Sequence, residues 1–449
     1  MRILVVGLNF HPEPTGIGKY TGELVAHLAS QGHDVHVITT PAYYPQWKIQ
    51  AGFSAWRYQK EIWRGVEVQR CPLWVPSHPS GFTRLIHLAT FAFSSLFALI
   101  AQIRWKPEIV MCIAPAFMNA PFVLAFARLI GSRSWLHIQD FELDAALNLG
   151  ILSGRKSIST LARSFERFVI TRFDRVSTIS NNMLALAVKK SGRKDGMILF
   201  PNWVDTQHIF PLMDKVNPLR TTLSLSTEQL VILYAGTMGR KQGLEQLIIA
   251  ARKLQDQPNL QFVLCGEGAI RAELEVAAQG LSNVRFLPMQ PFEKLNQLLN
   301  MADIHVLLQK ADVADLVMPS KLSGMFASGK AVIATAHPNT ELGCIVNKMG
   351  ILVPPEEPLA LADAIQQLSR SLEKREILGS KARAYAIQNW DAKVVLNQFG
   401  QHLQELAIES DKRVAGKLNP TLSDDIQSSI SGLSYGIKAK DQAQHQVMS

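Results

Sequence analysis

Residues 312–342 read DVADLVMPSKLSGMFASGKAVIATAHPNTEL, and the fold can be worked out from this stretch outward. A loop with Pro319, Ser320 and Lys321 precedes an apolar helical pattern, a break at a glycine, and a strand-like run at 331–334. Free amide groups at a helix start, with a lysine beside them, suit a phosphate group. The competing interpretation is an ordinary loop, helix and strand with a solvated lysine.

Length and composition indicate a globular protein of two domains. The chain has 449 residues, of which 47% are hydrophobic and 18% are charged, enough for two cores plus appendages. The formal net charge of +9 favours anionic partners such as acidic lipid or phosphorylated substrates. Since there is no long basic run, zinc-finger spacing or RNA-binding signature, nucleic acid is not an expected partner.

The four cysteines are scattered and form no CxxC pair. Cys112 and Cys265 lie in strand-like apolar runs, where buried, reduced thiols are the ordinary interpretation. This pattern predicts a reducing compartment.

The N-terminal segment predicts a β-strand, an α-helix and a second β-strand. Strand-like residues 3–7 are followed by the loop HPEPTGIGKYT, a helical pattern and a strand at 33–39. Gly16 and Gly18 are expected to let a ligand approach the backbone at the mouth of the sheet. The loop is neither a complete GxGxxG nor a P-loop, because Tyr20 stands where a P-loop needs a hydroxyl residue.

The same alternation continues along the chain and then starts again. Strands are predicted at 109–113, 134–138, 175–179 and 196–200, and in the second half at 231–235, 261–265, 284–286 and 303–308. A hairpin is expected around Gly65. The fold class is therefore α/β, with two Rossmann-like domains facing each other across a cleft, and a nucleotide ligand is expected between them.

The strand at 134–138 brings polar residues to the carboxyl edge of the first sheet, where ligands bind in open α/β folds. His137, Asp140 and Glu142 lie at or just past its end. A carboxylate there is a candidate base or hydrogen-bond partner for a substrate hydroxyl. A simple helix cap is the alternative for Asp140.

Residues 85–103, LIHLATFAFSSLFALIAQI, form the most apolar stretch of the chain. Polar residues interrupt it, and a predicted strand follows closely, so a buried or membrane-surface helix is favoured over a membrane span. Arg84, Arg104 and Lys106 at its ends would suit an anionic leaflet.

Longer motifs carry a family resemblance over most of the chain, to about residue 408. They are PNWVD at 201–205, YAGTMGRKQGLE at 234–245, GEG at 266–268, PSK at 319–321 and ASGKAVIAT at 327–335. The sequence resembles glycosyltransferase family 4, retaining enzymes of the GT-B fold that use nucleotide sugars. Within this family, the sequence is most similar to glycosyltransferases of colanic acid (exopolysaccharide) biosynthesis that are thought to be fucosyltransferases. The stretches NFHPEPTGIGKYTGEL and LHIQDFELDA carry this similarity.

The resemblance implies a site at the cleft. Asp140 and Lys321 are the expected catalytic residues, and Lys19, His137 and Glu142 are expected on the acceptor side. The expected donor-binding residues are Gly16, Gly18, Gly236, Arg240, Lys241, Glu267, Pro319, Ser320 and Lys321. No metal or other cofactor is expected, because basic side chains would neutralise the departing diphosphate.

It also implies an organisation and a location. The acceptor-side domain would span 1–208, the nucleotide-sugar domain 209–385, and helices at 386–410 would return to the first domain. Residues 411–449 are polar and predict a disordered tail. The expected partners are a nucleotide-sugar donor, with GDP-fucose suggested, and a polyprenyl-diphosphate-linked glycan acceptor. The enzyme would lie in the cytoplasm, peripherally on the inner face of the plasma membrane.

Some positions depart from the family pattern. The two acidic residues of the family's E-x7-E motif would fall near Leu316 and Gly324, and its donor-phosphate Arg and Lys at Thr237 and Gln242. Lys321 is the expected substitute for the displaced charge.

Three other functions are considered: a sugar-nucleotide epimerase of the same fold, a non-catalytic membrane scaffold, and a dinucleotide oxidoreductase, which the missing third glycine disfavours.

Overall fold

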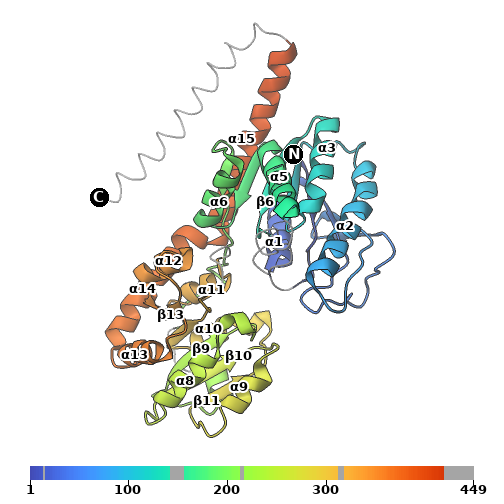
Figure 1. The fold of residues 1–449 in the computed structure, drawn as a ribbon. Helices are drawn as coiled ribbons and strands as arrows, with labels where there is room; N and C mark the ends of the chain where they lie inside the picture. Colours follow the sequence, from blue (N-terminus) through green and yellow to red (C-terminus); the bar gives the residue numbers. More distant parts are fainter. Residues whose placement is uncertain (14–15, 142–155, 213–216, 312–317, 419–449) are drawn as a thin grey trace, which may run out of the picture.

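The computed structural model describes residues 1–13, 16–141, 156–212, 217–311 and 318–418 (Figure 1). They form two α/β domains, each built on one sheet, and the predicted fold class is confirmed. The predicted boundary at 208–209 lies between the last strand of the first sheet and the first strand of the second.

The first sheet has eight strands in the order β3-β4-β2-β1-β5-β6-β7-β8. Their bounds are β1 Arg2–Gly7, β2 Asp34–Thr39, β3 Gln59–Trp63, β4 Val66–Arg70, β5 Ile109–Ala114, β6 Arg133–Ile138, β7 Arg175–Thr178 and β8 Met197–Leu199. All neighbours are parallel except β3 and β4, which form the predicted hairpin at Gly65, where the backbone is left-handed (φ 80°).

Helices cover both faces of this sheet. They are α1 Gly16–Ser30, α2 Gly81–Ala101, α3 Ala120–Ile130, α5 Lys156–Arg172 and α6 Asn181–Ser191, with a 3₁₀ turn at Phe117–Asn119. Leu4 and Val6 of β1 pack with α2, α3, α5 and α6, whereas Ile3 and Val5 pack with α1 and the C-terminal helix. The strands read as continuous apolar runs because both faces are buried.

The second sheet has six parallel strands in the order β11-β10-β9-β12-β13-β14. Its strands are β9 Leu230–Ala235, β10 Leu260–Cys265, β11 Val284–Leu287, β12 Ile304–Leu307, β13 Ala331–Thr335 and β14 Ile351–Val353. Its helices are α7 Pro218–Thr222, α8 Glu245–Lys253, α9 Arg271–Ala277, α10 Leu295–Met301, α11 Lys321–Ala327, α12 Glu341–Met349 and α13 Pro358–Ser369, with 3₁₀ turns at Arg240–Gln242 and Phe292–Lys294.

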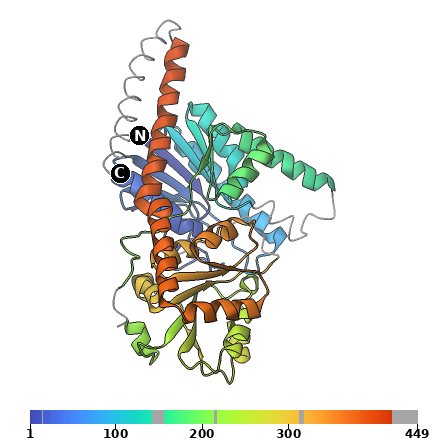
Figure 2. The same ribbon diagram turned by 90° about the vertical axis from the view of Figure 1, so that its left-hand side faces the viewer.

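Two C-terminal helices connect the domains, α14 (Leu372–Trp390) and α15 (Ala392–Leu418). At their junction, the backbone of Val204 pairs with Trp390 and Ala392 through hydrogen bonds of 2.8 and 2.9 Å. From there α15 runs onto the first domain (Figures 1 and 2). The prediction of a disordered tail from residue 411 is wrong for 411–418, because the helix continues to Leu418. Residues 419–449 lie outside the described part of the chain.

Helix α2 is long and apolar enough to cross a membrane by length and composition alone. However, one side of it is buried in the first domain's core through Leu88, Phe91 and Leu99. A spanning helix would have to withdraw these side chains from the core, so the fold supports the prediction of a helix that belongs to the domain.

The cysteines are free thiols. Cys71, Cys112 and Cys265 are buried, as predicted for the last two, and Cys344 is exposed. Burial raises the pKa of Cys112 to about 12, so this thiol stays protonated and unreactive at neutral pH.

Candidate functional site

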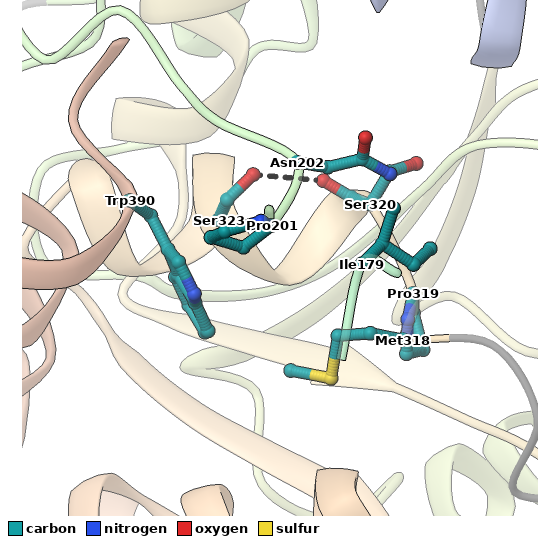
Figure 3. A pocket seen from close by; sticks show the side chains of 8 residues that line it. All are labelled: Ile179, Pro201, Asn202, Met318, Pro319, Ser320, Ser323 and Trp390. Atoms are coloured by element: carbon teal, nitrogen blue, oxygen red, sulfur yellow. Dashed lines mark hydrogen bonds between the residues drawn. The ribbon is translucent and has the colours of Figure 1, made fainter. Parts of the chain in front are cut away.

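A pocket lies between the two domains, where the loop before α11 meets the end of the first domain (Figure 3). It is lined by Ile179, Pro201, Asn202, Met318, Pro319, Ser320, Ser323 and Trp390. The Ser323 hydroxyl donates to the Ser320 carbonyl at 2.9 Å, which fixes the first turn of α11. The structure therefore places the predicted residues Pro319 and Ser320 at the junction of the domains.

Lys321 reaches from the start of α11 to the first glycine loop of the second domain. Its ammonium donates to the Tyr234 hydroxyl at 3.1 Å and lies 4.8 Å from the centre of that ring. A Cβ at Gly236 would come within 2.1 Å of the Lys321 Nζ, and the backbone there has a φ of 135°, which favours glycine. The structure thus brings together Lys321 and Gly236, two of the residues expected to bind the donor.

Burial changes the acid–base chemistry of Lys321. Loss of hydration lowers its pKa from 10.5 to about 8, because no carboxylate among its described contacts offsets the charge. An ammonium of this kind gains most from an anionic ligand, since it has already lost much of its water.

The two glycine loops of the second domain pack on each other. A Cβ at Gly266 would lie 1.9 Å from the Gly236 carbonyl oxygen, and one at Gly268 would lie 2.2 Å from that of Met238. The Met238 amide donates to the Glu267 carbonyl at 2.8 Å. These glycines are therefore required for loop-to-loop packing, in addition to any contact with a nucleotide.

Two other predicted donor residues of the second domain, Arg240 and Glu267, have partners within the protein. Arg240 is exposed and forms an ion pair of 2.8 Å with Glu273, and Lys241 is exposed as well. Glu267 pairs with Arg271 at 2.6 Å. The described contacts do not bring Arg240 or Lys241 to Lys321.

Arg271 and Gln242 add detail that sequence reasoning missed. Arg271 also donates to the Gly266 carbonyl at 2.7 Å, so it holds the GEG loop in place. The Gln242 side chain accepts from the Gly239 amide at 3.1 Å. Gln242 stands where the family has a lysine, and its side chain forms a hydrogen bond within its own loop.

On the first domain, Gly18 does not face open space. A Cβ there would lie 2.8 Å from both the Cβ and Oε2 of Glu13. Glu13 therefore occupies the side of Gly18 where a side chain would lie, which explains a glycine at this position. Gly16 has a left-handed backbone (φ 62°) at the start of α1, and a Cβ at this position would have no other side chain or backbone atom within 4 Å.

Glu13 was not singled out from the sequence, although it lies inside the glycine-containing loop. Its carboxylate accepts from the Tyr44 amide at 3.0 Å, the Tyr43 amide at 3.2 Å and the Asn9 side chain at 2.9 Å. Burial raises the pKa of Glu13, while these hydrogen bonds act in the opposite direction. Glu13 therefore fixes the loop that follows β2.

Lys19 and Tyr20 lie where α1 meets the second domain. Lys19 pairs with Glu23 at 3.0 Å, and Glu23 accepts from the Trp203 indole at 2.7 Å. The buried Tyr20 packs edge-on against Trp203, and its hydroxyl lies near the Ser320 side chain. Tyr20 is the residue whose presence ruled out a P-loop. It connects the glycine-containing loop of the first domain with the loop before α11.

His137 is a structural residue, and its assignment to the acceptor side is wrong. It is 2% exposed, its Nδ1 lies 2.9 Å from the Ser177 hydroxyl, and its ring packs near Phe200. Burial lowers its pKa to about 3, so the ring is neutral. Every residue of β6 is buried, and its side chains alternate between two covered faces instead of reaching the cleft.

Asp140 lies two residues past the end of β6 and is half-buried, at the carboxyl edge where it was predicted. Glu142 and the helix expected after Asp140 lie among residues 142–155, outside the described part of the chain.

An interdomain clasp joins the two domains beside the cleft. We use this name for Glu341 at the start of α12 and Asn181 and Asn182 at the start of α6. The Glu341 carboxylate accepts from the Asn182 amide at 2.7 Å, the Asn181 amide at 2.9 Å and the Asn181 side chain at 3.2 Å. A carboxylate of one domain thereby caps a helix of the other, an arrangement that sequence spacing could not reveal.

Comparison with known proteins accounts for both domains. The model of the Glycosyl transferase 4-like domain matches residues 15–203, and that of Glycosyl transferases group 1 matches residues 217–385. The chain is 44% identical over 407 residues to WcaI of Escherichia coli (strain K12), a glycosyl transferase assigned to colanic acid biosynthesis. This match covers 89% of the chain and 98% of the relative.

The chain belongs to the family 4 glycosyltransferases. Solved structures show the same GT-B fold in this glycosyltransferase. Sucrose-phosphate synthase of Thermosynechococcus elongatus superposes with a TM-score of 0.69 at 17% identity, covering 90% of this chain and 98% of that one. HepE of Anabaena in complex with UDP superposes with a TM-score of 0.62 at 16% identity, covering 90% and 100%. The epimerase and oxidoreductase alternatives are set aside by family membership.

Proposed function

We propose that this glycosyltransferase moves a sugar, with retention of configuration, from a nucleotide sugar to a polyprenyl-diphosphate-linked glycan in exopolysaccharide biosynthesis of the colanic acid type. GDP-fucose is the proposed donor, on the strength of the resemblance to the colanic acid enzymes. The enzyme would act in the cytoplasm, at the inner face of the plasma membrane.

The observation that carries the proposal is the partly buried ammonium of Lys321 beside the first glycine loop of the second domain. It is set against Gly236, which has no side chain, and it has a lowered pKa. A diphosphate placed there would restore the interactions that the ammonium has lost to burial. Charge then develops on the diphosphate as its bond to the sugar breaks, and a positive group already in position stabilises that charge.

The acceptor would enter from the first domain. Its hydroxyl would approach the sugar from the face that the diphosphate leaves, with Asp140 accepting a hydrogen bond from it. Basic side chains neutralise the diphosphate in this proposal, and a metal ion is not part of it. Transfer should therefore continue at an unchanged rate after treatment with EDTA.

The test is incubation of the purified protein with a panel of nucleotide sugars and a polyprenyl-diphosphate glycan. We expect free nucleotide to be released together with transfer of sugar from one donor. Lys348→Ala, on the exposed face of α12, is the control for Lys321→Ala and should behave as wild type. Interconversion of nucleotide sugars without release would indicate an epimerase, and no turnover of any donor would favour the scaffold.

A further inference from the structure

The side of the first domain formed by α2, α3 and α5 exposes large apolar side chains that the other described residues leave uncovered. Helix α2 contributes Phe82, Phe93, Phe97 and Ile100, helix α3 contributes Leu129, and helix α5 contributes Leu161, Phe165 and Phe168. Phe93 and Phe97 are 66% and 67% exposed, and Leu129 and Leu161 are 75% and 72% exposed. Large apolar side chains exposed together on a protein surface are typical of an interaction surface.

These side chains lie on one outer face. Buried residues of all three helices line the same core, so their exposed residues point away from the sheet on that side. The rings of Phe93 and Phe122 connect α2 to α3 at 6.4 Å, and Arg128 of α3 donates to the Arg172 carbonyl of α5 at 3.3 Å. Figure 1 shows α2 and α3 side by side, away from α15.

The charge on this face has one sign. Arg128, Arg163, Arg167 and Arg172 are all exposed, and no described carboxylate pairs with any of them. The sequences of α2, α3 and α5 contain a single acidic residue, Glu166. It is buried and paired with Lys190, so it does not offset the arginines on the surface.

Arginines and phenylalanines alternate on α5 instead of separating into an apolar centre and a charged rim. Arg172 lies over the ring of Phe168, 4.9 Å from its centre. Protein interfaces are also enriched in aromatic residues and arginine, but their centres are depleted of charge. At a lipid surface, by contrast, arginine stems lie along the apolar region while their guanidinium groups reach the headgroups.

We infer that the outer face of α2, α3 and α5 docks the enzyme on an anionic lipid bilayer. The phenylalanines of α2 enter the headgroup region, and the arginines of α5 supply the electrostatic attraction. This inference rests on the proposed function in one respect. Docking is useful to the enzyme because the proposed acceptor is linked to a lipid. The inference extends the docking surface beyond the apolar stretch of α2 to include α3 and α5.

The position of α2 suits a lipid-linked acceptor. His87, on the buried side of α2, lies 3.0 Å from the Tyr43 hydroxyl, and the Tyr43 amide is held by Glu13 next to α1. The docking helix is therefore connected by hydrogen bonds to the loop after β2, at the carboxyl edge of the first sheet. A docked enzyme would hold this edge close to the bilayer.

The experiment is flotation of the full chain with vesicles of phosphatidylcholine alone or with 30% phosphatidylglycerol, at low and high salt. We expect binding to the anionic vesicles only, and release at high salt. The triple variant Arg163→Gln, Arg167→Gln and Arg172→Gln should bind them roughly 100-fold more weakly, since each basic residue near the surface contributes roughly five-fold. Phe93→Ser with Phe97→Ser should also weaken binding.

The control is Lys253→Gln, Lys294→Gln and Lys381→Gln, which removes the same charge from exposed positions of the second domain. It should bind as wild type. An equal loss in this control, wild-type binding by the α5 variant, or failure of the wild type to bind anionic vesicles would overturn the docking surface. In the last case an acidic protein partner becomes the occupant to seek.

The outcomes for docking and for function are separable. Flotation needs no turnover, and melting temperatures show whether each variant folds. An enzyme that transfers sugar but ignores the vesicles refutes the docking surface alone. One that docks through these helices but turns over no donor refutes the proposed function alone.

Discussion

Lys321 shows how a single residue can be prepared for an anion by its surroundings. Its stem crosses the glycine at 236 and its ammonium contacts only a hydroxyl and an aromatic ring among the described residues. Such a cation is weakly solvated and has no described counter-ion, so its full interaction energy becomes available to a bound diphosphate.

The first prediction at this scale concerns the side chain itself. Lys321→Ala should reduce kcat/KM for the donor roughly 10- to 100-fold, because charge-assisted hydrogen bonds contribute about 1.5–3 kcal/mol. Donor titrations with steady-state kinetics measure it, with Lys348→Ala as the control. Equal kcat/KM values for Lys321→Ala and wild type would remove Lys321 from the site.

The second prediction is a pH dependence. The pKa of Lys321 is lowered to about 8 in the free protein. Its amine is therefore mostly protonated and positively charged below pH 8, and it loses this charge above pH 8. Since a diphosphate prefers the charged form, nucleotide affinity should be constant near pH 7 and fall up to about ten-fold per pH unit above 8. Calorimetric titrations between pH 6.5 and 9.5 measure this. Lys321→Arg should abolish the inflection, and a flat profile for wild type would contradict the linkage.

The third prediction separates a site role from a capping role for Asp140. Asp140→Asn keeps an oxygen able to cap a helix but removes the charge that would orient an acceptor. We expect sugar transfer to fall roughly 100-fold or more with little change in melting temperature. If transfer and melting temperature are both unchanged, Asp140 is only a cap, since asparagine preserves that role.

At the scale of elements, the interdomain clasp joins the N-terminal ends of α12 and α6. Glu341 adds negative charge at the positive end of α6, in addition to its hydrogen bonds with amides there. Because its partners are on the other domain, these bonds form only when the domains are close together. The clasp therefore favours the closed arrangement of the cleft.

The fourth prediction follows from this geometry. Glu341→Ala should open the cleft, increase the radius of gyration in small-angle scattering and raise the donor KM several-fold, since it removes charge-assisted hydrogen bonds worth about 1.5–3 kcal/mol. Asp363→Ala, at an exposed position on α13, is the control. Unchanged scattering and KM would show that the clasp does not hold the domains.

At the scale of the whole molecule, the last helix makes the stability of the first domain depend on the end of the chain. Phe399 of α15 is buried and stacks on Phe200 at 4.4 Å and near Trp135 at 4.8 Å. Val395, Leu403 and Leu406 extend the same contact. The first domain is thus completed by residues that follow the second domain in sequence.

The fifth prediction tests this dependence. Phe399→Ala should destabilise the first domain by about 3–5 kcal/mol, because it leaves a large cavity in the core. Scanning calorimetry should show a lower transition temperature for the first domain, while Gln401→Ala, on the exposed side of α15, should leave it unchanged. A shift confined to the second domain would contradict the assignment.

The sequence by itself determined the elements and the fold class. Apolar runs of strand length, separated by helical patterns and glycine loops, predicted the parallel sheets because strands buried on both faces must be apolar throughout. The sequence also allowed Lys321, Pro319 and Ser320 to be selected as candidate site residues. These features depend on short stretches of chain whose local patterns carry the signal.

Only the tertiary structure decided which side chains meet. His137 was expected at the cleft, yet it lies in the core, because helices cover both faces of β6. The contact of Tyr20 with Ser320 and the bond of Glu341 to Asn181 join residues far apart in sequence. The exposed faces of α2, α3 and α5 become one surface only when the sheet places these helices side by side. Such contacts depend on how the domains and layers pack, and local periodicity carries no information about that packing.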